Sequence, residues 1–252
     1  MIRSNSNPAR LTLHSTMRSA SVRLPTVLMV LTTLLIIKVT FNVVSNYPDY
    51  APPNFNSQFL SGRERYFFGP YRWAFYTHIV CGPVVLVAGM ILLSNRLRQQ
   101  FPRLHRALGR MQVICVLLLL TPSSLWMAWY AETGVVAGAG FATLAVLTAL
   151  CVMLGWRSAL HRRFVAHRRW MWRSFLLLCS AVVLRLTAGL ATVLSIESEW
   201  VYPISAWTSW LLQLSCFELW EVTKRLVTTD RILTEILRPD ATPMQTNVRS
   251  GS

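Results

Sequence analysis

Long apolar stretches separated by short polar segments make up most of the chain, and six of them contain about 20 residues each. Each stretch is continuous and lacks the alternation of a barrel strand, so we expect helices rather than a β-barrel. A helix of this length crosses a hydrocarbon core of about 30 Å and satisfies its own backbone hydrogen bonds there. The predicted spans are residues 24–44, 73–93, 111–130, 134–156, 174–195 and 203–223. The expected fold is an all-α, polytopic transmembrane bundle.

The same pattern predicts the domain organisation. One membrane domain covers residues 24–223, after a basic polar tail at 1–23. A second tail at 224–252 begins with an amphipathic helical pattern and then becomes rich in Pro, Thr and Ser, so we expect part of it to be disordered.

Composition narrows the class of protein further. The 252 residues are 53% apolar and only 14% charged, whereas a typical soluble domain has about 25% charged residues. The 25 Lys and Arg against 10 Asp and Glu give a net charge of +15, which alone would suggest a nucleic-acid partner. The basic residues cluster beside the apolar stretches, however, so we expect membrane lipids and no nucleic acid as partners.

The positions of the basic residues predict the orientation. Of the 25, 20 lie in the N-terminal tail, in the connections after the second and fourth spans, or in the C-terminal tail. By the positive-inside rule these segments face the cytoplasm. An even number of spans also places both termini on one side. We therefore expect a multi-pass protein of the inner (plasma) membrane with both termini in the cytoplasm.

Arg185 stands inside the fifth apolar stretch, where a charged residue is costly by about 2.5–3.5 kcal/mol. In one interpretation it binds an anionic ligand, as in a transporter of small anions. In the other it bonds to helix carbonyls or stacks on Trp207 or Trp210 and locks the packing. Both interpretations stay open at this point.

Glu218 lies near the cytoplasmic end of the sixth predicted span, where basic residues are dense. We expect it to form an ion pair with Arg106, Arg110 or Arg173 that ties helices together. A ligand-binding role is the alternative.

Three histidines lie in or beside the spans. His105 and His167 each precede an Arg at the cytoplasmic start of a span, and as a pair they are candidate axial ligands of haem b. Arg106, Arg110 and Arg173 would then hold acidic groups of the cofactor. The alternative is a polar belt that contacts phospholipid headgroups.

His78 lies in the outer half of the second span, above a stripe of small residues. Such a stripe allows close approach of a helix or a flat cofactor. The alternative is a packed histidine bonded to a carbonyl. The sequence has no phosphate-binding loop, nucleophile elbow, zinc-protease motif or dinucleotide fingerprint, so we predict no catalytic residue and no metal site.

Two segments together resemble the bacterial membrane-protein family catalogued as domain of unknown function 2306. They are the HRxxGR segment at 105–110 and the HxxWMxRS segment at 167–174. The resemblance extends over about 73–223. Gln112 and Gln213 depart from the pattern, at positions where an aromatic residue and Asn are expected. The resemblance implies a helical membrane bundle with no established activity.

The architecture is distantly similar to cytochrome b561 and ferric-reductase proteins, which implies electron transfer with a redox partner. A two-haem protein of that type needs a histidine pair in each leaflet, and the outer half here offers only His78. Three hypotheses follow: a cofactor-binding membrane module, an anion transporter that uses Arg185, and a structural or assembly protein without a cofactor.

Overall fold

The computed structural model describes residues 27, 30–57, 59–196 and 198–237. Every regular element within these residues is a helix, which confirms the all-α class. The predicted tail at 1–23 and the last part of the C-terminal tail, 238–252, lie outside the described residues.

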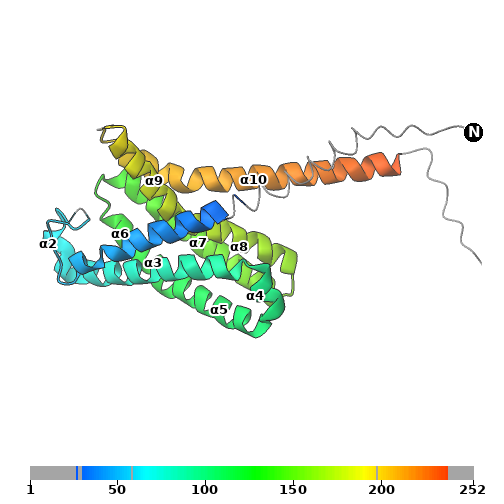
Figure 1. The fold of residues 1–252 in the computed structure, drawn as a ribbon, viewed down its shortest axis with the longest axis horizontal. Coiled ribbons are helices and arrows are strands. Elements are labelled where there is room, and N and C mark those ends of the chain that lie inside the picture. The colour runs from blue at the N-terminus through cyan, green and yellow to red at the C-terminus, as the bar shows by residue number, and fades with distance from the viewer. Residues whose placement is uncertain (1–26, 28–29, 58, 197, 238–252) are drawn as a thin grey trace, which may run out of the picture.

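The helices differ in length from short turns to one that runs well past the bundle (Figure 1). In chain order they are Val30–Ser45, η1 (Tyr47–Tyr50), α2 (Glu64–Tyr66), η2 (Phe67–Tyr71), α3 (Arg72–Leu92), α4 (Asn95–Gln100), α5 (Pro102–Ile114), η3 (Cys115–Leu120), α6 (Thr121–Trp129), α7 (Val135–Leu160), α8 (Phe164–Leu178), α9 (Ser180–Val193) and α10 (Val201–Ile236). The segments η2 and η3 are π-helical, and η3 joins α5 to α6 without a gap.

Four of these helices form a ring. Both α3 and α7 pack against α5 and against α8, so α5 and α8 face each other across the ring. Helix Val30–Ser45 packs on α3, α8 and α9 through Ile36, which contacts the cluster around Leu86 and Phe175. Helix α10 packs along α7, α8 and α9.

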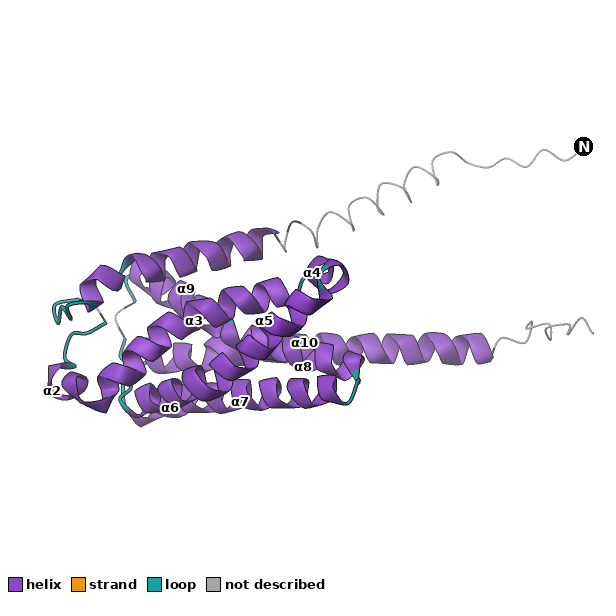
Figure 2. Ribbon diagram, turned by 90° about the horizontal axis from the view of Figure 1, so that it is seen from below, coloured by secondary structure: helices purple, strands orange, loops and turns teal. Residues whose placement is uncertain are grey.

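The bundle has two chemically different ends (Figures 1 and 2). We call the end with α2 the outer end; it carries the connections 46–71, 130–134 and 194–200. The opposite, inner end carries α4 and the turn 161–163 between α7 and α8, and α10 continues beyond it. The Arg-rich connections therefore gather at a single end of the bundle.

Within the described residues, four helical segments are long and apolar enough to cross a membrane, namely Glu64–Leu92, Pro102–Trp129, Val135–Leu160 and Phe164–Val193. Only 17–33% of the residues in their apolar windows are buried within the protein. The remaining apolar side chains face outward, and a face of that size needs lipid around it. The described part of the first predicted span, Val30–Ser45, is shorter than this length. Helix α10 is not among the four, since Ser, Thr, Gln and Trp residues interrupt its apolar part.

Two helix boundaries differ from those expected. Helix α5 begins at Pro102 rather than near residue 111, so the HRxxGR segment is helical. Proline suits the first helical position because its backbone angle is preset and its missing N–H is not needed there. Helix α8 likewise begins at Phe164, ten residues before the predicted span. Both changes place basic segments on helices at the inner end.

Small residues allow the helices to approach closely. A Cβ added to Gly138 in α7 would lie 2.6 Å from the carbonyl oxygen of Ala128 in α6, and one on Gly155 would collide with Met171 in α8. Close contact between helix backbones is a main source of helix association in lipid. The inner part of the ring is filled by Val85, Val116 and Val152 from three helices.

Candidate functional site

The ring of helices brings His105 and His167 together at the inner end. Each is the fourth residue of its helix, α5 and α8 respectively, and these are the two helices that face each other across the ring. A charge on His167 would act on His105. The two residues are 62 positions apart along the chain, and the ring places both at the inner end of the bundle.

The imidazole of His167 is oriented by the backbone of α7. Its Nδ1 lies 2.9 Å from the carbonyl oxygen of Gly155. A carbonyl only accepts, so Nδ1 donates the proton and Nε2 keeps its lone pair. The Nδ1 of His105 is buried and has no hydrogen-bond partner among the described residues. One ring nitrogen anchored on a carbonyl with the other left basic is the arrangement typical of metal-ligating histidine.

The three arginines expected near a cofactor differ in their availability. Arg106 and Arg110 are exposed on α5. Arg173 is engaged, since it donates two hydrogen bonds to Glu218, of 2.5 and 2.8 Å, and stacks over Trp170 at 4.7 Å. This is the ion pair expected for Glu218, and it ties α8 to α10. It also neutralises Arg173, so that of these three arginines Arg106 and Arg110 are the ones without an ion pair among the described residues.

Side chains suited to a protein-only metal site are sparse. Within the part of the chain that the structure describes, no three His, Cys, Asp or Glu side chains gather as they would around a metal ion. A haem differs because the porphyrin supplies four nitrogens and the protein supplies only axial ligands. His105 and His167 are the side chains at the inner end that could serve as such ligands.

Arg185 lies in α9, about 12 Å before the outer end of that helix at the helical rise. Its guanidinium donates one hydrogen bond, of 3.1 Å, to the carbonyl of Ala181 in the preceding turn. Among the described residues it has no ion pair, and its side chain is exposed on the protein surface. The carbonyl bond is one of the contacts expected from the sequence. The stacking on Trp207 or Trp210 is not formed, since Trp207 packs on Gly140 and donates to the Val136 carbonyl.

The charge of Arg185 acts on several aromatic hydroxyls and on one histidine. It acts electrostatically on Tyr47, Tyr50 and Tyr202, and also on His78 in α3. Burial raises the pKa of the Tyr50 phenol above its ordinary value, and the charge of Arg185 opposes this rise in part. Three elements, η1, α3 and α10, thus contribute polar side chains within electrostatic range of a cation that has no carboxylate partner among the described residues.

His78 is held by Ser124 of α6. Its Nδ1 lies 3.1 Å from Ser124 Oγ, and Oγ donates its only proton to the Leu120 carbonyl at 2.6 Å. Which of Nδ1 and Oγ donates in this contact is set by the tautomer of His78. The carbonyl bond expected for a packed histidine is replaced by this bond to a hydroxyl.

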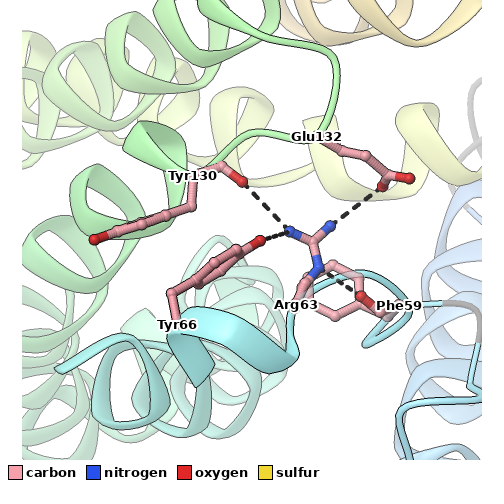
Figure 3. A network of polar contacts seen from close by, with 5 residues as sticks. All are labelled: Phe59, Arg63, Tyr66, Tyr130 and Glu132. Carbon is pink, nitrogen blue, oxygen red and sulfur yellow. Dashed lines mark hydrogen bonds and ion pairs between the residues drawn. The ribbon is translucent and has the colours of Figure 1, made fainter. Parts of the chain in front are cut away.

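Arg63, in contrast, is satisfied on every side (Figure 3). Its Nε donates to the Phe59 carbonyl at 2.6 Å, Nη1 lies 3.3 Å from both the Tyr66 hydroxyl and the Tyr130 carbonyl, and Nη2 pairs with Glu132 at 3.3 Å. The side chain is 6% exposed and stacks over the Phe59 ring at 4.6 Å. We call these five residues, Phe59, Arg63, Tyr66, Tyr130 and Glu132, the outer clasp. The clasp fastens the first outer connection to the one between α6 and α7.

Sequence reasoning missed the role of Arg63. Its signal was weak but present: a basic residue on the side of the membrane that is poor in basic residues, three and four positions from Tyr66 and Phe59. Residues at these spacings meet on one face of a helical turn. The partners Tyr130 and Glu132, 67 and 69 positions away, had no such local signal.

These features define an α-helical membrane protein with polar constellations at both ends of its bundle. The family model DUF2306, described as a predicted membrane protein, matches residues 75–221. This range covers more than half of the 252 residues, so the chain belongs to that family. The range includes His78, His105, His167 and Arg185 but not Arg63. Neither a curated protein nor a solved structure matches the chain.

Proposed function

We propose that the protein is a six-span protein of the inner (plasma) membrane, with both termini in the cytoplasm. The gathering of the Arg-rich connections at the inner end supports this orientation. Helix Val30–Ser45 packs on the ring and α10 runs along it, so they would supply the first and sixth spans.

We further propose that His105 and His167 bind a haem at the cytoplasmic end of the ring. The observation that carries this proposal is the pair itself: two imidazoles on facing helices, one with Nδ1 anchored on Gly155 and the other with a buried, unpartnered Nδ1. Arg106 and Arg110 are the cations available to the cofactor carboxylates, because Arg173 is committed to Glu218.

A haem held in this way would supply one-electron transfer within the membrane. The Gly155 carbonyl would orient the His167 ring and make its Nε2 more basic. The outer half provides no second pair of histidines, so the proposal is for one haem and an external redox partner.

Absorption spectroscopy of the detergent-purified full chain tests this proposal. We expect a Soret band that shifts on reduction, in protein from haem-replete cells. His105→Ala and His167→Ala should each reduce the amount of bound haem at least about tenfold, because each change removes a proposed ligand of the iron. His161→Ala is the matched control, since His161 is exposed at the same end and should leave the spectrum unchanged. A colourless preparation, or equal spectra in all three variants, would contradict the proposal.

Anion binding at Arg185 is the second candidate function, favoured by a separate observation. A membrane-depth cation that lacks a carboxylate and lies near His78, Tyr50 and Tyr202 is a ready site for an anionic ligand. Stabilisation of the protein by a small organic carboxylate, lost in Arg185→Ala, would support it. If neither a chromophore nor an anion effect is found, the third hypothesis, a structural or assembly role, is favoured.

A further inference from the structure

An open cavity of about 700 Å³ lies at the inner end, between the turn after α7, the start of α8 and α10. Nine residues line it, and five of them are arginines: Arg162, Arg163, Arg169, Arg173 and Arg225. Neither histidine of the proposed haem site is among the nine. The cavity is therefore lined by other residues than those of the proposed haem site.

Two of the five arginines are fixed in position by carboxylates of α10. Arg169 pairs with Glu221 at 3.1 Å, and the Glu221 side chain is 10% exposed. Arg173 makes the two-pronged pair with Glu218. These contacts hold the wall of the cavity rigid, because a guanidinium bound at two points loses the freedom of its long side chain.

The other three arginines are not fixed by carboxylates in this way, although the charge of Arg225 also acts on Glu218. Among the described residues, Arg162, Arg163 and Arg225 have no ion pair. Two carboxylates thus face five guanidinium groups around one cavity. Guanidinium groups bind phosphate through two parallel N–H bonds, and a cluster of them favours a phosphate over a single carboxylate.

The rim of the cavity is apolar as well as basic. Phe164 and Val165, at the start of α8, line the cavity and are 66% and 70% exposed. Exposed apolar side chains beside unpaired arginines suit the boundary between headgroups and acyl chains. A soluble phosphate compound would gain nothing from this rim, whereas a phospholipid would contact both parts.

We propose that this cavity binds the phosphate of an anionic phospholipid headgroup, with Arg162, Arg163 and Arg225 as the phosphate-binding residues and Phe164 and Val165 against the acyl chains. A phospholipid bound here bridges the turn after α7 to α10. It thereby stabilises the packing of the last helix on the ring.

Thermal unfolding of the detergent-solubilised full chain tests the assignment. The midpoint is measured during titration with short-chain phosphatidylglycerol, with short-chain phosphatidylcholine, and with inorganic phosphate. We expect saturable stabilisation by phosphatidylglycerol alone. The triple variant Arg162→Gln, Arg163→Gln, Arg225→Gln should bind it about a hundredfold more weakly, from three lost cations.

The control is Arg96→Gln, Arg98→Gln, Arg103→Gln, which removes the same charge from exposed residues of α4 and α5 at the same end. We expect its affinity to stay within about threefold of the original, since general attraction is screened by salt. An equal loss in both triples would overturn the proposal, because it would show attraction to the whole basic end. Stabilisation by inorganic phosphate alone would assign a soluble phosphate and overturn the lipid assignment.

The triple variant Arg162→Lys, Arg163→Lys, Arg225→Lys keeps the charge. It tests the proposal if the Gln variant does not fold. Lysine retains the charge but lacks the two-pronged geometry, so we expect binding about tenfold weaker than that of the original chain. An affinity unchanged by these lysines, in a protein with an unchanged melting midpoint, would overturn the role of the guanidinium groups.

Discussion

Two arginines at the outer side of the protein, Arg63 and Arg185, differ in nearly every physical respect. Arg63 lies in a connection, is buried, and bonds to two backbone carbonyls, a hydroxyl and a carboxylate. Arg185 lies within an apolar helix, is exposed, and bonds to one carbonyl of its own helix. The residue in the less costly environment thus has the more complete set of partners.

The difference separates a structural cation from a candidate functional one. A buried charge contributes to a fold only when hydrogen bonds replace its water, as they do for Arg63. A charge at membrane depth without a carboxylate is costly for the fold alone, and such residues commonly serve ligands. Replacing each arginine should therefore affect different properties of the protein.

The largest effect is expected from Arg63→Ala. This change leaves the carbonyls of Phe59 and Tyr130 without a donor and removes the link between two outer connections, so the free energy of unfolding should fall by about 3 kcal/mol. Unfolding of the purified protein in mixed micelles measures this. Arg65→Ala is the control, as Arg65 is exposed and should change stability by no more than about 0.5 kcal/mol. Equal effects of the two changes would show that the outer clasp does not stabilise the fold.

A change of opposite sign is expected from Arg185→Leu. It removes an unpaired cation from membrane depth, so the free energy of unfolding should stay the same or rise by up to about 2 kcal/mol. The same unfolding experiment measures it, and carboxylate-dependent stabilisation should disappear. Arg185→Lys, which keeps the charge, should retain part of that stabilisation. A strong loss of stability in Arg185→Leu would show that Arg185 is a structural residue like Arg63.

The smallest effect is expected from Glu132→Gln within the outer clasp. The Glu132 side chain is 66% exposed, so water screens its attraction to Arg63, and we expect a loss below about 1 kcal/mol. The difference from the original chain should shrink further in high salt. Glu64→Gln provides the comparison, because Glu64 is exposed and has no ion pair among the described residues. A loss near that of Arg63→Ala would mean that the carboxylate, not the carbonyls, holds Arg63.

The apolar pattern predicted much of the fold because helix formation and lipid exposure are local properties. Segments at 73–93 and 134–156 correspond closely to α3 and α7. The pattern failed where a helix begins ahead of its apolar part, as α5 does at Pro102 and α8 at Phe164. The helical pattern expected at the start of the C-terminal tail is confirmed, since α10 continues to Ile236. Hydrogen bonds within a helix do not depend on the polarity of its side chains, so hydropathy does not locate these ends.

For the candidate sites, the sequence identified residue types but few of their partners. It predicted three arginines as possible partners of Glu218. The packing of α8 against α10 brings Arg173 to that carboxylate. The sequence also proposed His105 with His167, and the order of helices around the ring places both at the same end of the bundle.

The sequence alone determined that much of this protein is exposed to lipid and roughly where its helical segments lie, because both properties follow from the chemistry of neighbouring residues. The tertiary structure decided which charges are satisfied. Arg63 forms hydrogen bonds with residues 67 and 69 positions away. Arg185 has no partner with a negative charge among the described residues. Partnership between distant groups depends on which helices pack together, and side-chain fit across the whole bundle sets that packing.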